Sequence, residues 1–224
     1  DLAAALRQIA EFYSAQLPVK VVGITGSVGK TSTKEFIAAV LAQKYRVHKT
    51  QGNFNNEIGV PLTVLSMPED TETAVLEMGI NHFGEMRRLS RIARPDICVM
   101  TNIGQCHLEY LGSREGILKA KSEIFEYMQE DGSVVLNGDD DMLATLTRVK
   151  GRKPVVYGIS GQAGCGVPGK DAGSAEGFDI YAENIRMKGI LGSEAVFCHR
   201  GVRFPVQIPL PGEHMVYNAL AAAA

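Results

Sequence analysis

Hydrophobic residues along the chain alternate between short β-branched runs and longer stretches of helical periodicity. The short runs predict buried strands, and the longer stretches predict helices between them. The expected strands are residues 19–25, 45–49, 74–78, 96–103, 133–136 and 155–158. The expected helices are residues 1–16, 30–43, a segment before Met67, 84–92, 113–128 and about 140–148. This alternation predicts an α/β fold, in which a mainly parallel sheet carries helices on both faces.

The pattern changes after residue 158. Residues 160–177 are rich in Gly, Ala and Ser, which predicts a flexible surface loop. Polar and apolar residues then alternate in segments 178–181, 195–197 and 202–208, which predicts a small antiparallel β appendage. The chain starts inside one helical pattern and ends inside another that has no C-terminal cap, so we expect a piece of a longer protein.

One predicted strand leads directly into a glycine loop and then a helix, in the sequence VVGITGSVGKTS at residues 21–32. Such a loop presents backbone N–H groups and the positive end of a helix to a phosphate. The expected phosphate-binding residues of this P-loop-type fold are Gly26, Ser27, Val28, Gly29, Lys30, Thr31 and Ser32. Lys30 would reach the β- and γ-phosphates, and the Thr31 hydroxyl would bind Mg²⁺. The spacing differs from the common G-x-x-x-x-G-K-[ST] pattern, whose first glycine position is Ile24 here.

Other polar residues follow the predicted strands, at the sheet edge where α/β proteins bind ligands. They are Asn53, Asn55, Asn56, Glu77, Asn102, His107, Asn137 and Asp139. Glu77 ends a buried strand, where a carboxylate is costly unless it is paired or binds a metal. A solvated strand end is one interpretation, but beside a phosphate loop a Mg²⁺ ligand is the better one. His107 alone is weak evidence, because a single loop histidine is usually a surface residue.

Lys121 lies in the middle of an apolar helical face. At about 100° per residue this face contains Ile117, Ile124, Phe125 and Met128, whereas Lys119, Glu123 and Glu126 lie opposite. A lysine that points toward the interior has a lowered pKa, and its neutral amine is nucleophilic. The alternative is a lysine whose stem crosses the apolar face and whose ammonium reaches solvent.

Composition and charge narrow the possible partners. The 224 residues have a net charge of −2 and no basic block, so we expect no nucleic-acid partner. No apolar run approaches about 18 residues and no signal-peptide pattern is present, so we expect a cytoplasmic protein without membrane insertion. The four cysteines lack metal-site spacing, and we expect them to be reduced and structural.

Six motifs occur in order along the chain: T-G-S-V-G-K-T-S, G-N-F-N-N-E-I-G-V-P, L-E-M-G-I-N-H-F-G-E, T-N-I-G-x-x-H-L-E, K-A-K-S-E-I-F and G-E-H-M-V-Y-N-A-L-A-A. They resemble the motifs of Mur ligases, from about residue 19 to the end with a gap across 160–177. The shortened glycine loop is this family's form. Members have three domains, and the chain resembles the central one. The resemblance thus implies a linker helix from an N-terminal domain at 1–18 and an ATP-binding domain at 19–224, with a C-terminal ligase domain beyond it.

The second and third motifs resemble the subgroup that adds D-Ala-D-Ala to UDP-MurNAc-tripeptide in peptidoglycan synthesis. This resemblance implies an ATP-dependent amide ligase. The tripeptide carboxylate would attack the γ-phosphate to give an acyl phosphate, and the dipeptide amine would then displace phosphate. A central domain alone would carry the ATP site without being able to ligate. We expect the protein to be a monomer.

The resemblance also implies roles for single residues. Lys30 and the loop amides match the family's phosphate site, and Thr31 and Glu77 match the ligands of a first Mg²⁺. His107 and Lys121 match a second metal site, where the family's lysine is carbamylated.

Further matches concern the nucleotide and the acceptor substrate. Asn218 matches an asparagine that contacts adenine, and Met215 stands where many relatives carry asparagine. Asn137 and Asp139 lie near the nucleotide by analogy. The candidate substrate-binding residues are Asn53, Asn55 and Asn56.

Other functions remain possible from the sequence. A ligase for another amino acid, or of the folylpolyglutamate type, would share most of the motifs. A regulatory GTPase would need an N-K-x-D motif after a later strand, and the chain has none. A non-catalytic nucleotide-binding module would not need Lys30, Thr31, Glu77, His107 and Lys121 all to be intact.

Overall fold

A computed structural model describes residues 1–106, 108–159 and 177–224. Strands and helices alternate through most of the chain, as the hydrophobic pattern predicts. The strands are β1 (Lys20–Thr25), β2 (Val47–Lys49), β3 (Thr73–Glu77), β4 (Ile97–Met100), β5 (Ser133–Asn137), β6 (Val155–Ile159), β7 (Ile180–Met187), β8 (Ser193–His199) and β9 (Val202–Ile208). The α-helices are α1 (Leu2–Ser14), α2 (Lys30–Leu41), α3 (Gly59–Leu65), α4 (Glu85–Ala93), α5 (Leu108–Leu111), α6 (Arg114–Ser122) and α7 (Glu213–Ala223).

Among the described residues these strands form one nine-stranded sheet, in the order β2-β3-β1-β4-β5-β6-β7-β8-β9. Strands β1 to β6 pair in parallel, and β7 joins β6 in parallel as well. The pairs β7–β8 and β8–β9 are antiparallel, which confirms the expected antiparallel segment. This segment continues the edge of the parallel sheet.

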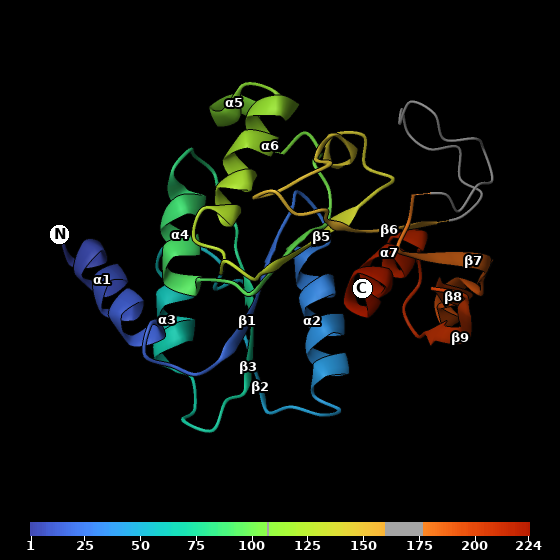
Figure 1. Cartoon of the computed structure of the whole chain (residues 1–224), viewed down its shortest axis with the longest axis horizontal. Coiled ribbons are helices and arrows are strands. Elements are labelled where there is room, and N and C mark those ends of the chain that lie inside the picture. The colour runs from blue at the N-terminus through green and yellow to red at the C-terminus, as the bar shows by residue number, and fades with distance from the viewer. Residues whose placement is uncertain (107, 160–176) are drawn as a thin grey trace.

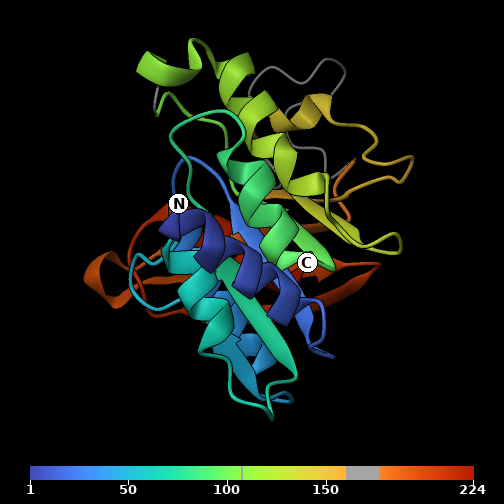
Figure 2. The ribbon, with the colours of Figure 1, turned by 90° about the vertical axis from the view of Figure 1, so that its left-hand side faces the viewer.

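Neighbouring residues of the strands point to opposite faces of the sheet, and each face has its own hydrophobic core. Val21, Leu76 and Met100 pack with α3, α4 and α6. Val22 and Val75 pack on the other face with α2 and α7. Figure 1 shows α3 and α4 on one side of the sheet and α2 and α7 on the other, and in Figure 2 α1 lies over the side of α3 and α4.

Two expected helices are wrong in extent. Of residues 140–148, only the 3₁₀ turn η2 (Leu143–Thr145) is helical. The Asp140 carboxylate accepts hydrogen bonds from the backbone N–H groups of Ile103, Met142 and Leu143, and these bonds hold a compact turn. The helix expected at 113–128 ends as an α-helix at Ser122 and continues as the 3₁₀ turn η1 (Glu123–Phe125).

The strand expected at 96–103 stops at Met100, because the next residues hold the glycine loop. The short helix α5 falls in a region expected to be a loop. The expected flexible loop at 160–177 lies, apart from Gly177, outside the described residues. Within the described parts of the chain, each helix is too short or too polar to cross a bilayer.

Candidate functional site

The glycine loop joins the end of β1 to the start of α2, at the edge of the sheet where β1, β3, β4 and β5 end. Gly26 and Gly29 have φ angles of 149° and 82°, which side chains rarely allow. A Cβ atom on Gly26 would lie 2.0 Å from the Thr101 hydroxyl oxygen. The loop's Val28 N–H donates to the Asn102 carboxamide oxygen at 2.9 Å. Residues after β4 therefore fix a loop that only glycine permits.

Two lysine ammonium groups converge on the carbonyl oxygens of this loop. Lys30 Nζ donates to the Gly26 carbonyl at 2.9 Å and to the Ser27 carbonyl at 3.2 Å. Lys121 Nζ also donates to the Gly26 carbonyl, at 3.0 Å. Burial lowers the pKa of Lys30, although the Glu77 carboxylate opposes the shift. Burial and the nearby Lys30 charge together lower the pKa of Lys121 to about 8.

The buried position of Lys121 confirms the prediction from helical periodicity. Lys121 is 2% exposed, and Ile117, Ile124 and Phe125 of the same face are buried. Lys119, on the opposite face of α6, is exposed. The Lys121 side chain thus ends inside the protein, and the solvent-reaching alternative is wrong.

Glu77 ends β3 with a carboxylate that is 1% exposed. Its Oε1 accepts hydrogen bonds from the Thr31 hydroxyl at 3.1 Å and from the Asn55 amide nitrogen at 2.8 Å. Its Oε2 has no hydrogen-bond partner. The nearest ion-pair partner of Oε2 is Lys34 Nζ at 3.8 Å. Glu77 is therefore buried at the site, and the solvated strand end is excluded.

Thr31 and Glu77 fit a magnesium ion. Mg²⁺ prefers oxygen ligands and is commonly held by one or two carboxylates together with substrate phosphates. The pair offers a hydroxyl and a buried carboxylate with one oxygen free of hydrogen bonds. Among the described residues, no cluster of three or more His, Cys, Asp and Glu side chains could hold a metal by itself. Thr31 and Glu77 thus suit a metal that arrives with phosphates.

The structure brings other predicted residues to the same loop. Asn218 on α7 is 5% exposed, and its Oδ1 accepts from the Thr33 hydroxyl at 3.1 Å and lies next to Gly29. Asn218 Nδ2 points to the Met215 sulfur at 3.6 Å, the position at which asparagine was expected in relatives. The Asn137 amide nitrogen donates to the Thr101 carbonyl at 3.2 Å.

The remaining predicted residues differ in their contacts. Asn55 reaches Glu77, as described above, whereas the Asn56 carboxamide accepts from the Ile58 and Gly59 N–H groups at the start of α3. Asn53 is exposed. The Asp139 carboxylate accepts from the Ile159 N–H and the Tyr217 hydroxyl. His107 lies outside the described residues.

Lys34 is the site residue that the sequence reasoning missed. It is 1% exposed and lies beside Glu77. Its spacing from Ile37 and Ala38 is the i, i+3, i+4 spacing of a buried helix face, and this signal could have identified it.

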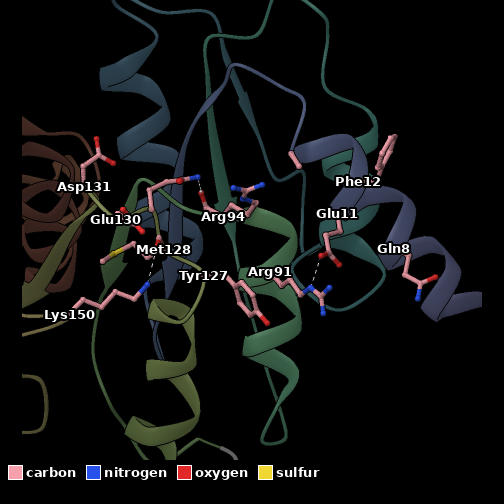
Figure 3. Close-up of a pocket in the computed structure, with 12 residues that line it drawn as sticks. Gln8, Glu11, Phe12, Arg91, Arg94, Tyr127, Met128, Glu130, Asp131 and Lys150 are labelled. Carbon is pink, nitrogen blue, oxygen red and sulfur yellow. Dashed lines mark hydrogen bonds and ion pairs between the residues drawn. The ribbon is translucent and has the colours of Figure 1, made fainter.

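A large groove in the described part of the chain lies elsewhere. This groove of about 1250 Å³ runs between α1, the end of α4 and residues 127–131. Figure 3 shows an Arg91–Glu11 ion pair in it, with Nε and Oε1 2.5 Å apart. None of the predicted site residues lines it. The converging polar groups, rather than the depth of a cavity, make the glycine loop the candidate functional site.

The chain is similar to known proteins along its whole length. Residues 24–224 match the sequence model of the family described as "Mur ligase middle domain". The chain is 43% identical over 224 residues to the UDP-N-acetylmuramoyl-tripeptide–D-alanyl-D-alanine ligase of Bacillus subtilis. The match covers all of this chain and 44% of that protein. A crystal structure of MurF from Acinetobacter baumannii superimposes with a TM-score of 0.86 at 31% identity, over 100% of this chain and 46% of that one.

The MurF ligase of Thermotoga maritima, solved in complex with ADP, superimposes with a TM-score of 0.83 at 30% identity. The match covers 99% of this chain and 48% of that one. The chain thus spans less than half the length of the relatives that it matches.

Proposed function

The chain belongs to the Mur ligase family, and we propose on this basis that it is the ATP-binding central part of a ligase that adds D-Ala-D-Ala to UDP-MurNAc-tripeptide. The similarity to UDP-N-acetylmuramoyl-tripeptide–D-alanyl-D-alanine ligases along the whole chain supports these two substrates. The observation that carries the proposal is the arrangement of Thr31 and Glu77 beside a strained glycine loop that leads into α2. This arrangement suits a nucleotide triphosphate with its metal.

The chain's own residues would bind and orient the phosphates. The N–H groups of the loop and the first turn of α2 would hold the β- and γ-phosphates, with Lys30 turning from the loop carbonyls to the phosphate oxygens. Thr31 and Glu77 would hold Mg²⁺, whose charge neutralises the phosphates. The tripeptide carboxylate would attack the γ-phosphorus of ATP, which releases ADP and gives an acyl phosphate. The amine of D-Ala-D-Ala would then displace phosphate from the acyl phosphate and form the amide.

The other site residues would support this chemistry. We propose that His107 and carbamylated Lys121 hold a second Mg²⁺, and that Asn218 contacts adenine with Asn137 nearby. Asn55 would contact the tripeptide substrate beside the metal, because its amide already donates to the Glu77 carboxylate. The flanking residues Asn53 and Asn56 are proposed as further substrate contacts. We place the enzyme in the cytoplasm, as a monomer.

The test is ligation by the longer protein that contains this chain. We expect the purified protein to release ADP and phosphate only when UDP-MurNAc-tripeptide and D-Ala-D-Ala are both present. Single amino acids, or a folate with glutamate, should give no product in parallel reactions. A preference for one of those substrates would replace the proposed one. A Glu77→Gln variant serves as the matched inactive control.

A further inference from the structure

Lys34 is a buried lysine that the proposed chemistry does not use. It lies in the first half of α2, and its side chain is 1% exposed. An ammonium group taken out of water is costly unless carboxylates surround it. Lys34 has two carboxylates within ion-pair distance: Glu35 Oε1 at 3.3 Å and Glu77 Oε2 at 3.8 Å. The pair with Glu77 differs from an ordinary surface ion pair, because Glu77 is buried as deeply as Lys34.

A row of alternating charges connects this lysine to the surface. Glu35 is about half exposed and also pairs with Lys49 at the end of β2. The ion pairs link Lys49 to Glu35, Glu35 to Lys34 and Lys34 to Glu77. Lys34 can therefore move its charge toward either carboxylate without leaving an ion pair.

Lys34 lies beside the Glu77 oxygen that is available to a metal ion. Thr31 and Asn55 occupy Oε1 of Glu77, so Oε2 is the oxygen without a hydrogen bond. Lys34 Nζ is the cation beside Oε2. The Lys34 ammonium and a metal ion repel each other strongly when both lie close to the Glu77 carboxylate, because Coulomb energies rise in a poorly solvated site.

The charge of the whole site adds to this repulsion. In the chain without nucleotide, Lys30, Lys34 and the unmodified Lys121 lie beside Glu77 or the loop, so ammonium groups outnumber the buried carboxylate. A divalent cation that enters alone meets this excess of positive charge. The phosphates of a nucleotide reverse the sign, and a metal that arrives with them is attracted.

We propose that Lys34 is an internal counter-ion of Glu77 that keeps free divalent cations out of the site until nucleotide phosphates bind. When the metal binds Glu77, Lys34 shifts its pairing to Glu35. The proposal rests on the proposed function only in taking Glu77 as a metal ligand. It assigns Lys34 and Glu35 to positioning, since neither touches the reacting atoms.

The test is Mn²⁺ binding to the 224-residue chain, measured by electron paramagnetic resonance with and without ADP. We expect the unaltered chain to bind Mn²⁺ weakly without ADP, and Lys34→Met to bind it about tenfold more tightly or better. Glu35→Gln should act in the opposite direction, because Lys34 then has only Glu77 as a partner. It should weaken Mn²⁺ binding in the presence of ADP severalfold. Lys119→Met, an exposed lysine on α6, is the matched control and should change neither value.

Opposite effects of the two variants separate positioning from general damage to the fold. Glu35 is half exposed, so Glu35→Gln tests the proposal even if Lys34→Met does not fold. Unchanged Mn²⁺ binding in Glu35→Gln, or equal binding by Lys34→Met and the unaltered chain, would overturn it. Glu77→Gln separates the assignment of Glu77 as a metal ligand from the role of Lys34. If it leaves Mn²⁺ binding with ADP intact, the metal assignment itself is wrong; if it alone weakens binding, only the role of Lys34 fails.

Discussion

The buried ammonium of Lys121 predicts how the stability of the chain depends on pH. Its pKa is lowered from 10.5 to about 8 in the folded protein, chiefly by burial. Below pH 8 the folded state must keep a charge that it disfavours, so stability is reduced there. Between pH 8 and 10.5 the unfolded chain binds a proton that the folded chain does not, and stability therefore rises with pH.

The size of the effect follows from the shift. A displacement of this size corresponds to about 3 kcal/mol of unfolding free energy, of which about 2 kcal/mol is recovered between pH 7 and 9.5. Lys121→Met removes the titrating group and keeps an apolar stem in the same buried position. The variant loses the hydrogen bond to the Gly26 carbonyl, which costs about 1 kcal/mol at every pH.

The assay is urea unfolding of the chain and of Lys121→Met at pH 7 and 9.5. The difference between the two proteins isolates Lys121, because this is the titratable side chain that the substitution removes. We expect Lys121→Met to be the more stable protein at pH 7 and to lose about 2 kcal/mol of that advantage by pH 9.5. A difference that is the same at both pH values, or that grows with pH, would refute the buried-amine argument.

Three further substitutions test the site. Gly29→Ala should weaken binding of a fluorescent ADP analogue about tenfold, because φ is 82° and the new Cβ would lie 2.8 Å from Asn218 Oδ1; unchanged affinity would contradict the loop geometry. Glu77→Gln should abolish the Mg²⁺ dependence of that binding while the chain still folds, because Lys34 keeps Glu35 as an ion-pair partner; an unaltered Mg²⁺ dependence would exclude the metal role. In the longer enzyme, Lys121→Ala should lose ligation and regain part of it with acetate or formate, whereas Lys119→Ala should keep it, and full activity of Lys121→Ala would speak against a carbamate.

Local patterns predicted much of the fold, because the central strands β1, β3, β4 and β5 bury apolar runs and the main helices have apolar faces. The same periodicity placed Lys121 correctly in the interior. It failed at residues 140–148, where the Asp140 carboxylate collects three backbone N–H groups and holds a turn. A bond from a side chain to the distant Ile103 cannot be read from local propensity.

The candidate site was predictable where one segment carries the chemistry, as in the glycine loop. Contacts between segments were not. The pairing of Asn55 with Glu77 joins residues 22 positions apart, and Asn218 reaches Thr33 across 185 positions. Lys34 was missed as well, because its pairing with Glu77 depends on β3 packing beside α2.

A crystal structure of the chain with Mg²⁺ and a non-hydrolysable ATP analogue tests the central claim most directly. The account predicts β- and γ-phosphates on the N–H groups of residues 26–31, Mg²⁺ on Thr31 and Glu77, and adenine beside Asn218. A nucleotide bound instead in the groove between α1 and α4, or a metal away from Glu77, would contradict it.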